Sequence, residues 1–516
     1  MKIYRGLILA IISFSSFTLF CQDLNIIPYP VHVEQFDGFF DLNSNTEIIH
    51  GAYLESRAKQ LKAYLYPATG FDLKAGSSDK QSNQIILNLN EDLKNLGDEG
   101  YTLKVNQNRI LIEAFNSKGL FYAFQTLLQL LPVEIFRHAK VEDREWHVPN
   151  CSIKDTPQYA WRGLMIDYSR TFWNKRITRK YIDAMALYKL NKLHMHLTDD
   201  QGWRIEISKY PELTELASKF DTSYHEPKER EGYFSQSDIK EIINYARERN
   251  IEIIPEIEMP GHSSEVFSIF PELSCKGDTM IIHPFTQGPG IHKEIFCAGN
   301  DESFVFLFNV LSEITGLFPS TYIHIGGDEA PKDHWKECVK CQQRMKDEGL
   351  NNEHELQSWF IKQIEAYLSA HNKIMIGWDE IVEGGLSETA TVMYWRAWEE
   401  EVPAFVLDQG NSIILCPTTY CYFDYTYETT STEKVYSYQP VSDDFKKKYR
   451  EKILGVQANY WSHLNRNEPE MDRQIFPRIL ALAEVGWLDE SHKDWESFTL
   501  RLNQHLSILD ILDIYY

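Results

Sequence analysis

Between residues 322 and 329 the chain reads Tyr322-Ile323-His324-Ile325-Gly326-Gly327-Asp328-Glu329. The β-branched and aromatic residues predict a short buried strand, and the two glycines end it. Two adjacent carboxylates follow, and because both cannot ionise cheaply in a dry cleft, we expect their pKa values to split. One charged carboxylate and one proton donor suit acid-assisted cleavage of a glycosidic bond. An isolated Asp-Glu dipeptide is more often part of a solvated loop, so the rest of the chain decides between the two interpretations.

Seven further segments resemble this strand and predict a barrel. From about Thr156 onward, short apolar strands alternate with loops and helices, and eight such units are typical of a closed parallel barrel. The predicted fold class is α/β: a (β/α)8 TIM barrel catalytic domain preceded by a smaller α/β domain. The expected strands are 163–167, 192–197, 252–257, 322–325, 374–377, 391–394, 412–415 and 455–458.

Amphipathic helices are expected between several strands. The clearest are 237–250, which begins Ser-Asp-Ile-Lys and ends Arg-Glu-Arg-Asn, and 355–370, which follows a 3.6-residue period. The last three connections are less plainly helical. Residues 22–152 mix strand-like and helical patterns without recognisable chemistry, and residues 153–516 are predicted as the barrel.

The first 21 residues are predicted as a signal peptide. Lys2 and Arg5 precede an apolar run over residues 6–20, and Cys21 follows it. No later stretch is long and apolar enough for a transmembrane span. We therefore expect an exported protein, periplasmic or at the cell surface or secreted. A lipid anchor on Cys21 is the alternative, which the bulky Phe20 disfavours.

The composition restricts the classes of binding partner that the chain is expected to have. A net charge of −23 argues against nucleic acid and anionic lipid surfaces, because no basic stripe offsets the repulsion. Aromatic residues make up 13% of the chain, with 12 Trp, which suits stacking on sugar rings but also large cores. The oligomeric state does not follow from the sequence.

Polar and aromatic residues follow the predicted strands at their carboxyl ends, where chemistry collects in this type of barrel. A single Trp is more often core than ligand platform, but three at one rim are hard to place in a core. The residues that follow the strands are Asp167 and Arg170; Asp199 and Asp200; Glu258 and His262; Asp328 and Glu329; Trp378; Trp395; Tyr422 and Asp424; and Trp461.

The chain resembles the family 20 glycoside hydrolases, the β-N-acetylhexosaminidases, over nearly all of its mature length. The resemblance implies an exo-acting enzyme that removes terminal β-linked GlcNAc or GalNAc from glycans with retention and needs no cofactor. The motifs that carry it are Trp161-Arg162-Gly163 with Asp167-Tyr168-Ser169-Arg170, His194-Met195-His196-Leu197-Thr198-Asp199-Asp200, Pro255-Glu256-Ile257-Glu258-Met259-Pro260-Gly261-His262, and His324-Ile325-Gly326-Gly327-Asp328-Glu329.

The resemblance also implies a role for each catalytic residue. The 2-acetamido carbonyl of the substrate attacks the anomeric carbon, so an oxazolinium intermediate replaces an enzyme nucleophile. Glu329 is implied as the general acid and later the base. Asp328 accepts the acetamido N–H, and Tyr422 donates to the acetamido oxygen.

The substrate-binding residues are implied in the same way. Trp378, Trp395 and Trp461 wall the pocket, and Arg170 grips the O3 and O4 hydroxyls. The remaining roles are Asp199 supporting that end of the pocket, Asp424 near O6, and His262 tuning the acid. From the residues alone, Arg170 could instead pair with Asp167 or Asp199, and Asp200 and Glu258 are expected as scaffolding.

One position departs from the family. The Trp that corresponds to Trp461 is usually followed two residues later by a Glu that binds O4 or O6, whereas this chain has His463. An imidazole offers one donor and one acceptor in place of a carboxylate that accepts two hydroxyls. We therefore expect an altered preference at C4 or C6, such as galacto or 6-sulfated sugars.

No metal is assigned from the sequence. Cys338 and Cys341 have redox or zinc spacing, but no second pair at a suitable distance completes a site. Cys275 and Cys297 could form a disulfide in an oxidising compartment. His194 and His196 share a strand face without an evident third ligand, so we interpret them, and His324, as hydrogen-bonded strand residues.

Two rivals remain for the function. A lacto-N-biosidase-like enzyme that releases a disaccharide has related motifs. A glycan-binding protein without catalysis would keep the aromatic walls and Arg170 but would not need Asp328, Glu329 and Tyr422.

Overall fold

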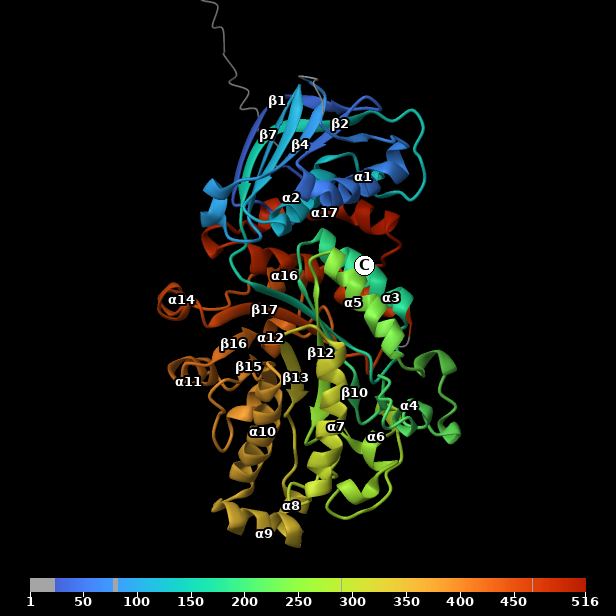
Figure 1. The fold of residues 1–516 in the computed structure, drawn as a ribbon, viewed down its shortest axis with the longest axis vertical. Helices are drawn as coiled ribbons and strands as arrows, with labels where there is room; N and C mark the ends of the chain where they lie inside the picture. Colours follow the sequence, from blue (N-terminus) through green and yellow to red (C-terminus); the bar gives the residue numbers. More distant parts are fainter. Residues whose placement is uncertain (1–23, 78–81, 289, 466) are drawn as a thin grey trace, which may run out of the picture.

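The computed structural model describes residues 24–77, 82–288, 290–465 and 467–516. The predicted signal peptide, residues 1–21, lies outside the described residues. Within the described parts, every helix is too short or too polar to traverse a bilayer. The chain forms an N-terminal α/β unit and a barrel, which lie one above the other in Figure 1.

In the described part of the N-terminal unit, seven strands form one mixed sheet in the order β1-β7-β5-β6-β4-β2-β3. Helices α1 (Glu55–Thr69) and α2 (Ser117–Leu130) lie between this sheet and the barrel (Figure 1). Nearly every residue of α2 is buried, because both of its faces are covered. The strands are β1 (His32–Leu42), β2 (Glu47–His50), β3 (Lys74–Gly76), β4 (Gln84–Leu89), β5 (Tyr101–Asn106), β6 (Arg109–Ala114) and β7 (Trp146–Asp155).

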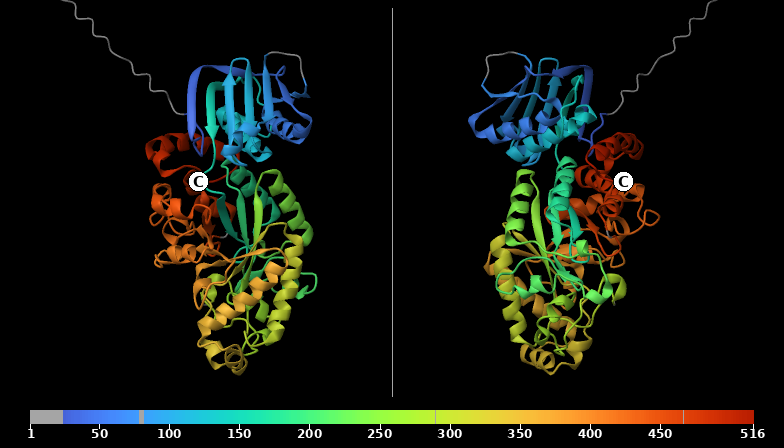
Figure 2. Two further views of the ribbon diagram at one scale, coloured as in Figure 1. Left: turned by 60° about the vertical axis from the view of Figure 1, so that its left-hand side comes forward. Right: turned by 90° about the vertical axis from the view of Figure 1, so that its right-hand side faces the viewer.

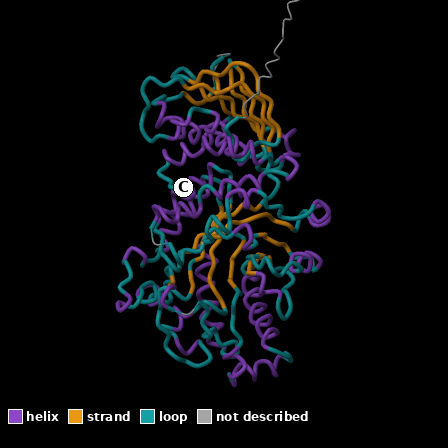
Figure 3. The backbone as a smooth tube through the Cα atoms, turned by 180° about the vertical axis from the view of Figure 1, so that it is seen from behind, coloured by secondary structure: helices purple, strands orange, loops and turns teal. Residues whose placement is uncertain are grey.

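Eight parallel strands of the described chain close into a barrel in the order β12-β13-β14-β15-β16-β17-β8-β9. Each corresponds to a segment predicted from the sequence, so the barrel and the preceding α/β domain are confirmed. The tube in Figure 3 shows the strands surrounded by helices. The strands are β8 (Trp161–Asp167), β9 (Lys192–His196), β12 (Glu252–Met259), β13 (Tyr322–Gly326), β14 (Ile374–Trp378), β15 (Thr391–Tyr394), β16 (Ser412–Leu415) and β17 (Ile453–Tyr460).

The helices differ from the expectation in detail. The helix expected at 237–250 is α5 (Gln236–Glu248), and Ser235 forms its capping box with Asp238. The helix expected at 355–370 is α10 (Glu353–Ala370), capped by Asn352. The remaining helices that follow β8 in the described chain are α3 (Lys175–Leu187), α4 (Glu212–Glu215), α6 (Ser264–Phe267), α7 (Asp301–Leu317), α8 (Asp333–Glu337), α9 (Val339–Glu348), α11 (Val402–Asp408), α12 (Thr418–Cys421), α13 (Thr432–Tyr436), α14 (Asp443–Tyr449), α15 (Glu468–Ile475), α16 (Arg478–Trp487) and α17 (Trp495–Ile511).

The later connections are irregular, as the sequence indicated. Only the 3₁₀ helix η8 (Asp379–Val382) lies between β14 and β15, and three short helices, α12 to α14, lie between β16 and β17. On the other side of the barrel, the short strands β10 (Thr198–Asp199) and β11 (Gly202–Trp203) pair after β9. These loops bring polar residues to the carboxyl ends of the strands.

The two units meet at the amino ends of the barrel strands. Strand β7 ends at Asp155 and β8 begins at Trp161, so the predicted boundary between 152 and 153 falls within the last residues of β7. Helices α8 and α9, which follow the carboxyl end of β13, lie at the opposite end of the molecule from the N-terminal sheet (Figures 1 and 2). The carboxyl ends of the strands thus face away from the N-terminal unit.

Candidate active site

The chain turns sharply at the end of β13. Gly326 and Gly327 have φ values of 69° and 93°, which favour glycine. A Cβ on Gly326 would lie 1.6 Å from Glu258 Oε2, and one on Gly327 would lie 2.7 Å from Ile381 Cγ2. The turn leaves Asp328 buried and Glu329 exposed at the rim, so the two adjacent acids have different environments.

His262 lies between two pairs of carboxylates. Its Nδ1 is 3.3 Å from Asp199 Oδ1 and 3.2 Å from Asp200 Oδ2. Its Nε2 is 3.7 Å from Asp328 Oδ2 and 3.5 Å from Glu329 Oε2. Burial opposes protonation, but Asp199, Asp200 and Glu329 outweigh it and raise the pKa of His262 well above its usual value. The imidazolium therefore links the carboxylates of Asp199 and Asp200 to those of Asp328 and Glu329.

The pKa values of the site depend on which carboxylates have cationic partners. Burial raises the pKa of Asp328 to about 8, and its Oδ1 has no hydrogen-bond partner among the described residues. The sequence predicts a split between the two acids. In the structure it is Asp328 whose pKa is raised, although the resemblance implies that Asp328 is the charged carboxylate of the two.

Arg170 joins two acids and one aromatic ring. Its Nη2 is 2.7 Å from Asp199 Oδ2, and its Nη1 is 3.5 Å from Asp167 Oδ2. The guanidinium carbon is 4.9 Å from the centre of the Trp461 ring. Burial opposes ionisation of the Asp199 carboxyl, but the positive charges of Arg170 and His262 outweigh it and hold the pKa of Asp199 well below its usual range. The ion pairs considered from the residues alone are therefore present.

Four aromatic side chains form one contiguous group, which we term the aromatic wall: Trp378, Trp395, Tyr422 and Trp461. The ring centres of Trp378 and Trp461 are 5.9 Å apart, and those of Trp461 and Tyr422 are 6.3 Å apart. Trp395 stacks on Tyr422 at 6.0 Å. Burial raises the pKa of Tyr422 well above 10, so its hydroxyl keeps its proton.

Asp424 and His463 lie at the Arg170 end of the site. His463 Nε2 is 4.0 Å from Asp424 Oδ2, and the His463 ring packs 4.6 Å from Phe285. Burial, together with the charge of Arg170, lowers the pKa of His463 to about 4, so the imidazole is neutral at pH 7. Burial raises the pKa of Asp424 to about 7.

The structure brings all the predicted site residues to the carboxyl end of the barrel, where contacts or charge interactions connect them. Sequence reasoning missed a second acidic pair there, Asp379 and Glu380, directly after Trp378. Glu380 accepts a 2.9 Å hydrogen bond from Trp395 Nε1, and Arg396 Nε lies 3.2 Å from Asp379 Oδ1. Burial raises the pKa of Asp379 to about 8. The signal was available, because Asp379-Glu380 follows a strand as Asp328-Glu329 does.

The histidines inside the barrel are hydrogen-bonded strand residues, as interpreted from the sequence. His196 contacts Glu256 through Nδ1 and Asp199 through Nε2 at 2.8 Å. Glu256 also lies 3.0 Å from His194 Nε2 and 2.8 Å from His324 Nδ1. No third group beside the two histidines was evident from the sequence, and the structure shows that Glu256 of β12 is that group.

Asp200 and Glu258 are both buried close to His262. Asp200 Oδ1 accepts hydrogen bonds from Ser264 N at 3.0 Å and Ser264 Oγ at 2.6 Å, while its Oδ2 contacts His262. Burial raises the pKa of Glu258 well above its usual value. The contacts of Asp200 agree with a scaffolding role, whereas neither carboxyl oxygen of Glu258 has a hydrogen-bond partner among the described residues.

Two expectations about the cysteines are wrong. Cys275 and Cys297 have free thiols, so they do not form the disulfide considered from the sequence. Cys338 and Cys341 do have a second pair beside them, because the fold brings Cys275 and Cys297 to them from another loop. The spacing of the cysteines in the sequence does not reveal this group, because its members come from separate segments that only the fold brings together.

Comparisons with known protein families match both units of the chain. The family model described as "Glycosyl hydrolase family 20, catalytic domain" matches residues 159–490, and that described as "Glycosyl hydrolase family 20, domain 2" matches residues 23–156.

Individual relatives cover nearly the whole chain. It is 38% identical to a β-hexosaminidase of Porphyromonas gingivalis over 96% of its length, and the match spans 64% of that protein. It resembles the solved structure of a family 20 β-N-acetylhexosaminidase from Streptomyces coelicolor with a TM-score of 0.83 and 30% identity, covering 96% of this chain and 97% of that one. An exo-β-N-acetylglucosaminidase from Vibrio harveyi, solved with N-acetylglucosamine, gives a TM-score of 0.85 and 31% identity, covering 96% and 78% of the two chains.

Proposed function

Because the chain belongs to glycosyl hydrolase family 20, we propose that it is a retaining, exo-acting β-N-acetylhexosaminidase that releases terminal β-linked GlcNAc or GalNAc from glycans. One observation carries the proposal most directly. Glu329 and Asp328 both approach His262 Nε2, at 3.5 and 3.7 Å, at the same end of the barrel as the aromatic wall. This arrangement supplies a proton donor and a second carboxyl group where a sugar ring can stack.

Glu329 is the general acid and base of the proposed reaction. Its proton passes to the glycosidic oxygen while the bond from that oxygen to the anomeric carbon breaks. In the second half of the reaction it takes a proton from the water that attacks the anomeric carbon. Its exposed position lets it reach both the departing group and the incoming water.

Asp328 and Tyr422 act on the 2-acetamido group. The acetamido oxygen attacks the anomeric carbon and closes the oxazolinium ring, so positive charge develops on the amide. The acetamido N–H donates to Asp328, and this hydrogen bond favours the carboxylate form that burial otherwise disfavours. Tyr422 donates its hydroxyl proton to the acetamido oxygen. Two displacements at the same carbon give overall retention.

The other site residues bind the sugar. The aromatic wall encloses the acetamido methyl and the sugar face. Arg170, held by Asp199 and Asp167, presents its guanidinium to the O3 and O4 hydroxyls. Because Asp199 also contacts His262, the sugar-binding end and the acid-base end share one ion-pair network.

A matched set of substrates and variants tests the proposal. Wild type should hydrolyse an aryl N-acetyl-β-glucosaminide with the β-anomer as first product, and it should fail on the aryl β-glucoside that lacks the acetamido group. Glu329→Gln should lower kcat by about 10²- to 10⁴-fold, with a smaller loss for a leaving group that needs no proton. The control is Glu400→Gln, which alters an exposed carboxylate after β15.

Three results would contradict the proposal. Equal rates on the two aryl substrates would exclude participation by the acetamido group. Binding of GlcNAc without turnover by the wild type would favour the non-catalytic glycan-binding alternative. A disaccharide as the product from an oligosaccharide would favour the lacto-N-biosidase-like alternative.

We further propose that His463 changes the preference at C4 or C6 towards galacto or 6-sulfated sugars. The proposal rests on the neutral His463 imidazole, whose Nε2 is 4.0 Å from Asp424 Oδ2, where a carboxylate would otherwise add negative charge. The Arg170 guanidinium, paired with Asp199 and Asp167, stays charged at this end of the site. An anionic substituent therefore meets less repulsion there than it would beside a carboxylate, and the imidazole offers an axial hydroxyl one donor and one acceptor in place of two acceptors.

Rates on gluco, galacto and 6-sulfated aryl substrates test this preference. We expect kcat/KM for a galacto or 6-sulfated substrate to equal or exceed that for the plain gluco substrate. A profile dominated by the plain gluco substrate would contradict it.

Export also remains a proposal, carried by the basic and apolar N-terminal residues. Mass analysis of the protein from its native cells should give a mature chain that begins after residue 21. A diacylglycerol adduct on Cys21 would instead establish the lipid anchor.

A further inference from the structure

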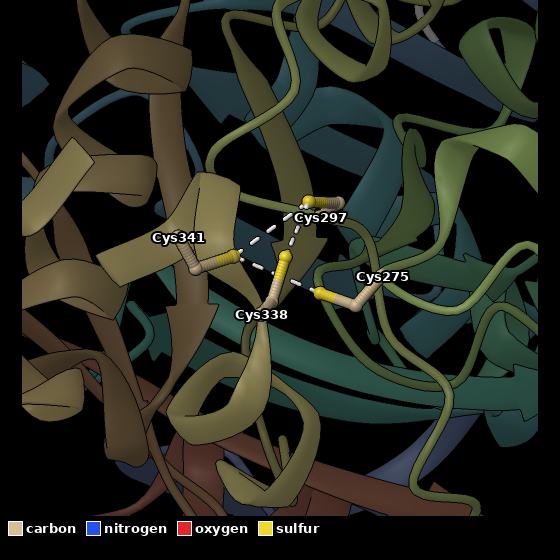
Figure 4. A group of neighbouring side chains, drawn as sticks. All are labelled: Cys275, Cys297, Cys338 and Cys341. Carbon is tan, nitrogen blue, oxygen red and sulfur yellow. Dashed lines mark hydrogen bonds between the residues drawn. The ribbon is translucent and has the colours of Figure 1, made fainter. Parts of the chain in front are cut away.

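Four cysteines from three segments converge in the loops that follow the carboxyl ends of β12 and β13. Cys275 and Cys297 lie in the long loop between β12 and α7. Cys338 precedes α9, and Cys341 lies in the first turn of that helix. In Figure 4 the four sulfur atoms point towards a common centre. We refer to these residues as the cysteine cluster.

The distances within the cysteine cluster match those around one metal ion. Cys275 Sγ is 3.6 Å from Cys341 Sγ, and Cys297 Sγ is 3.7 Å from Cys338 Sγ and 3.6 Å from Cys341 Sγ. All four sulfurs lie within 4.8 Å of one another. Tetrahedral zinc bonded to four thiolates at about 2.3 Å requires sulfur atoms about 3.8 Å apart. We propose that the cysteine cluster binds a structural zinc ion.

The arrangement favours a single ion over two disulfides. A disulfide joins sulfurs in exclusive pairs, whereas Cys297 Sγ is almost equally far from two other sulfurs. A Cys-x-x-Cys pair completed by two cysteines from another loop is a common structural zinc arrangement. Thiolate ligands and tetrahedral geometry select zinc over calcium or magnesium. With all four positions taken by sulfur, the ion has a structural role.

The backbone around the cluster is packed closely enough to hold it. A Cβ on Gly299 would lie 2.2 Å from the carbonyl carbon of Lys340, so only glycine allows this approach beside Cys341. Trp335 Nε1 donates a 2.9 Å hydrogen bond to the carbonyl of Phe296, the residue before Cys297. Lys276, next to Cys275, lies 3.7 Å from Glu337, next to Cys338. The two segments therefore meet independently of the sulfurs.

The position of the cluster suggests what the ion stabilises. It joins the loop that carries His262 to the connection that carries Asp328 and Glu329. Phe296 N donates a 2.9 Å hydrogen bond to Pro260 O, two residues before His262. A Cβ on Gly261 would lie 3.3 Å from Asp328 O. A zinc ion here would fix the spacing of these loops without contacting the sugar.

Metal analysis of the full chain, purified without chelators, tests the site. We expect about one zinc ion per chain in the wild type and little in Cys341→Ser. Cys151→Ser is the matched control, because Cys151 is buried in β7 of the N-terminal sheet, and it should keep the zinc. A wild type without zinc, or with iron in its place, would overturn the proposal.

Two measurements on the wild type remain decisive if the variant does not fold. Thiol titration in denaturant with a chelator should count the cluster cysteines as reduced, and two disulfides would overturn the proposal. Exchange into cobalt should give the ligand-field and charge-transfer bands of a tetrahedral thiolate complex. Removal of zinc should also lower the melting temperature, and an unchanged melting temperature would argue against a structural ion.

Discussion

At the residue scale, partners decide how burial affects each carboxyl group. Asp199 and Asp328 are both buried. Asp199 lies 2.7 Å from Arg170 and 3.3 Å from His262, and its pKa is held low. Among the described residues, the cationic neighbour of Asp328 is His262 alone, at 3.7 Å, and burial raises the pKa of Asp328 to about 8. Asp199 is therefore charged at pH 7, whereas Asp328 is mostly protonated at that pH.

Asp328→Asn should change how stability depends on pH. The folded pKa of Asp328 is above the unfolded value, so between about pH 4 and about pH 8 the folded state holds a proton that the unfolded state has released. The wild type therefore loses stability as pH rises through this window. The variant cannot lose that proton, so its stability relative to wild type should rise up to about pH 8 and then level off.

Thermal unfolding of both proteins between about pH 5 and about pH 9 measures this difference. Asp37→Asn, at an exposed position of the N-terminal sheet, is the control and should follow the wild type. A constant difference between Asp328→Asn and wild type across the range would contradict the raised pKa.

His463→Glu should restore a preference for unsubstituted gluco sugars. The new carboxylate near Asp424 would accept hydroxyl hydrogen bonds and repel a sulfate. The ratio of kcat/KM for the plain substrate to that for the 6-sulfated one should rise about tenfold, which corresponds to roughly 1.4 kcal/mol.

Leu464→Glu adds the same charge one residue further on, at an exposed position, and should leave the ratio nearly unchanged. An equal change in both variants would mean that the effect comes from net charge alone and not from the pocket.

At the scale of elements, local sequence patterns predicted the strands and helices well, but they did not predict contacts between segments that are distant in the sequence. All eight barrel strands were predictable, because each is a short apolar run followed by chemistry-bearing residues. The predicted start of α5 was late by one residue, because both Ser235 and Ser237 can cap a helix. Only Ser235 has an acidic residue, Asp238, three positions later to complete a capping box. The cysteine cluster and Glu256 were missed, because their partners lie on other strands and loops. Their proximity depends on the closed barrel, which the sequence does not show directly.

Gly326→Ala should disrupt the end of β13. The residue has a φ of 69°, and its Cβ would overlap Glu258 Oε2 at 1.6 Å. We expect a loss of about 2 kcal/mol or more in stability from the strained backbone and the displaced carboxyl group, with a fall in kcat as Asp328 and Glu329 shift.

Gly316→Ala in α7 is the matched control, because nothing lies within 4 Å of its Cβ. Alanine there should stabilise the helix by up to about 1 kcal/mol. Circular dichroism melts and assays of both variants test this pair, and a Gly326→Ala variant with wild-type stability and kcat would show that the turn tolerates a side chain.

At the scale of the whole molecule, a buried ionic network joins the two units. Lys189, before β9, lies 3.0 Å from Asp155 Oδ2 and from the Tyr101 hydroxyl. Trp487 of α16 donates a 2.8 Å hydrogen bond to Asp155 Oδ1. The N-terminal sheet, the amino end of the barrel and its last helices therefore share one carboxylate. The network lies at the opposite end of the barrel strands from the site, so the N-terminal unit supports the barrel without contributing side chains to the site described above.

Lys189→Met should destabilise the protein without changing the chemistry. The lysine is fully buried, and its loss leaves the Asp155 carboxylate without its cation. Breaking a buried pair in this way costs about 3 to 5 kcal/mol, and the hydrogen bonds from Tyr101 and Trp487 favour the lower end of that range. Calorimetry should show a lower melting temperature, while kcat at moderate temperature stays at the wild-type value.

The double variant Lys189→Met/Asp155→Asn separates the charge from the packing. Removing the stranded carboxylate should recover part of the loss, so the double variant should be less destabilised than the sum of the single ones. Lys240→Met, at an exposed position of α5, is the control and should melt with the wild type. If Lys189→Met has the same melting temperature as Lys240→Met, the network does not stabilise the contact between the two units. If Lys189→Met also lowers kcat markedly, the network is not independent of the site.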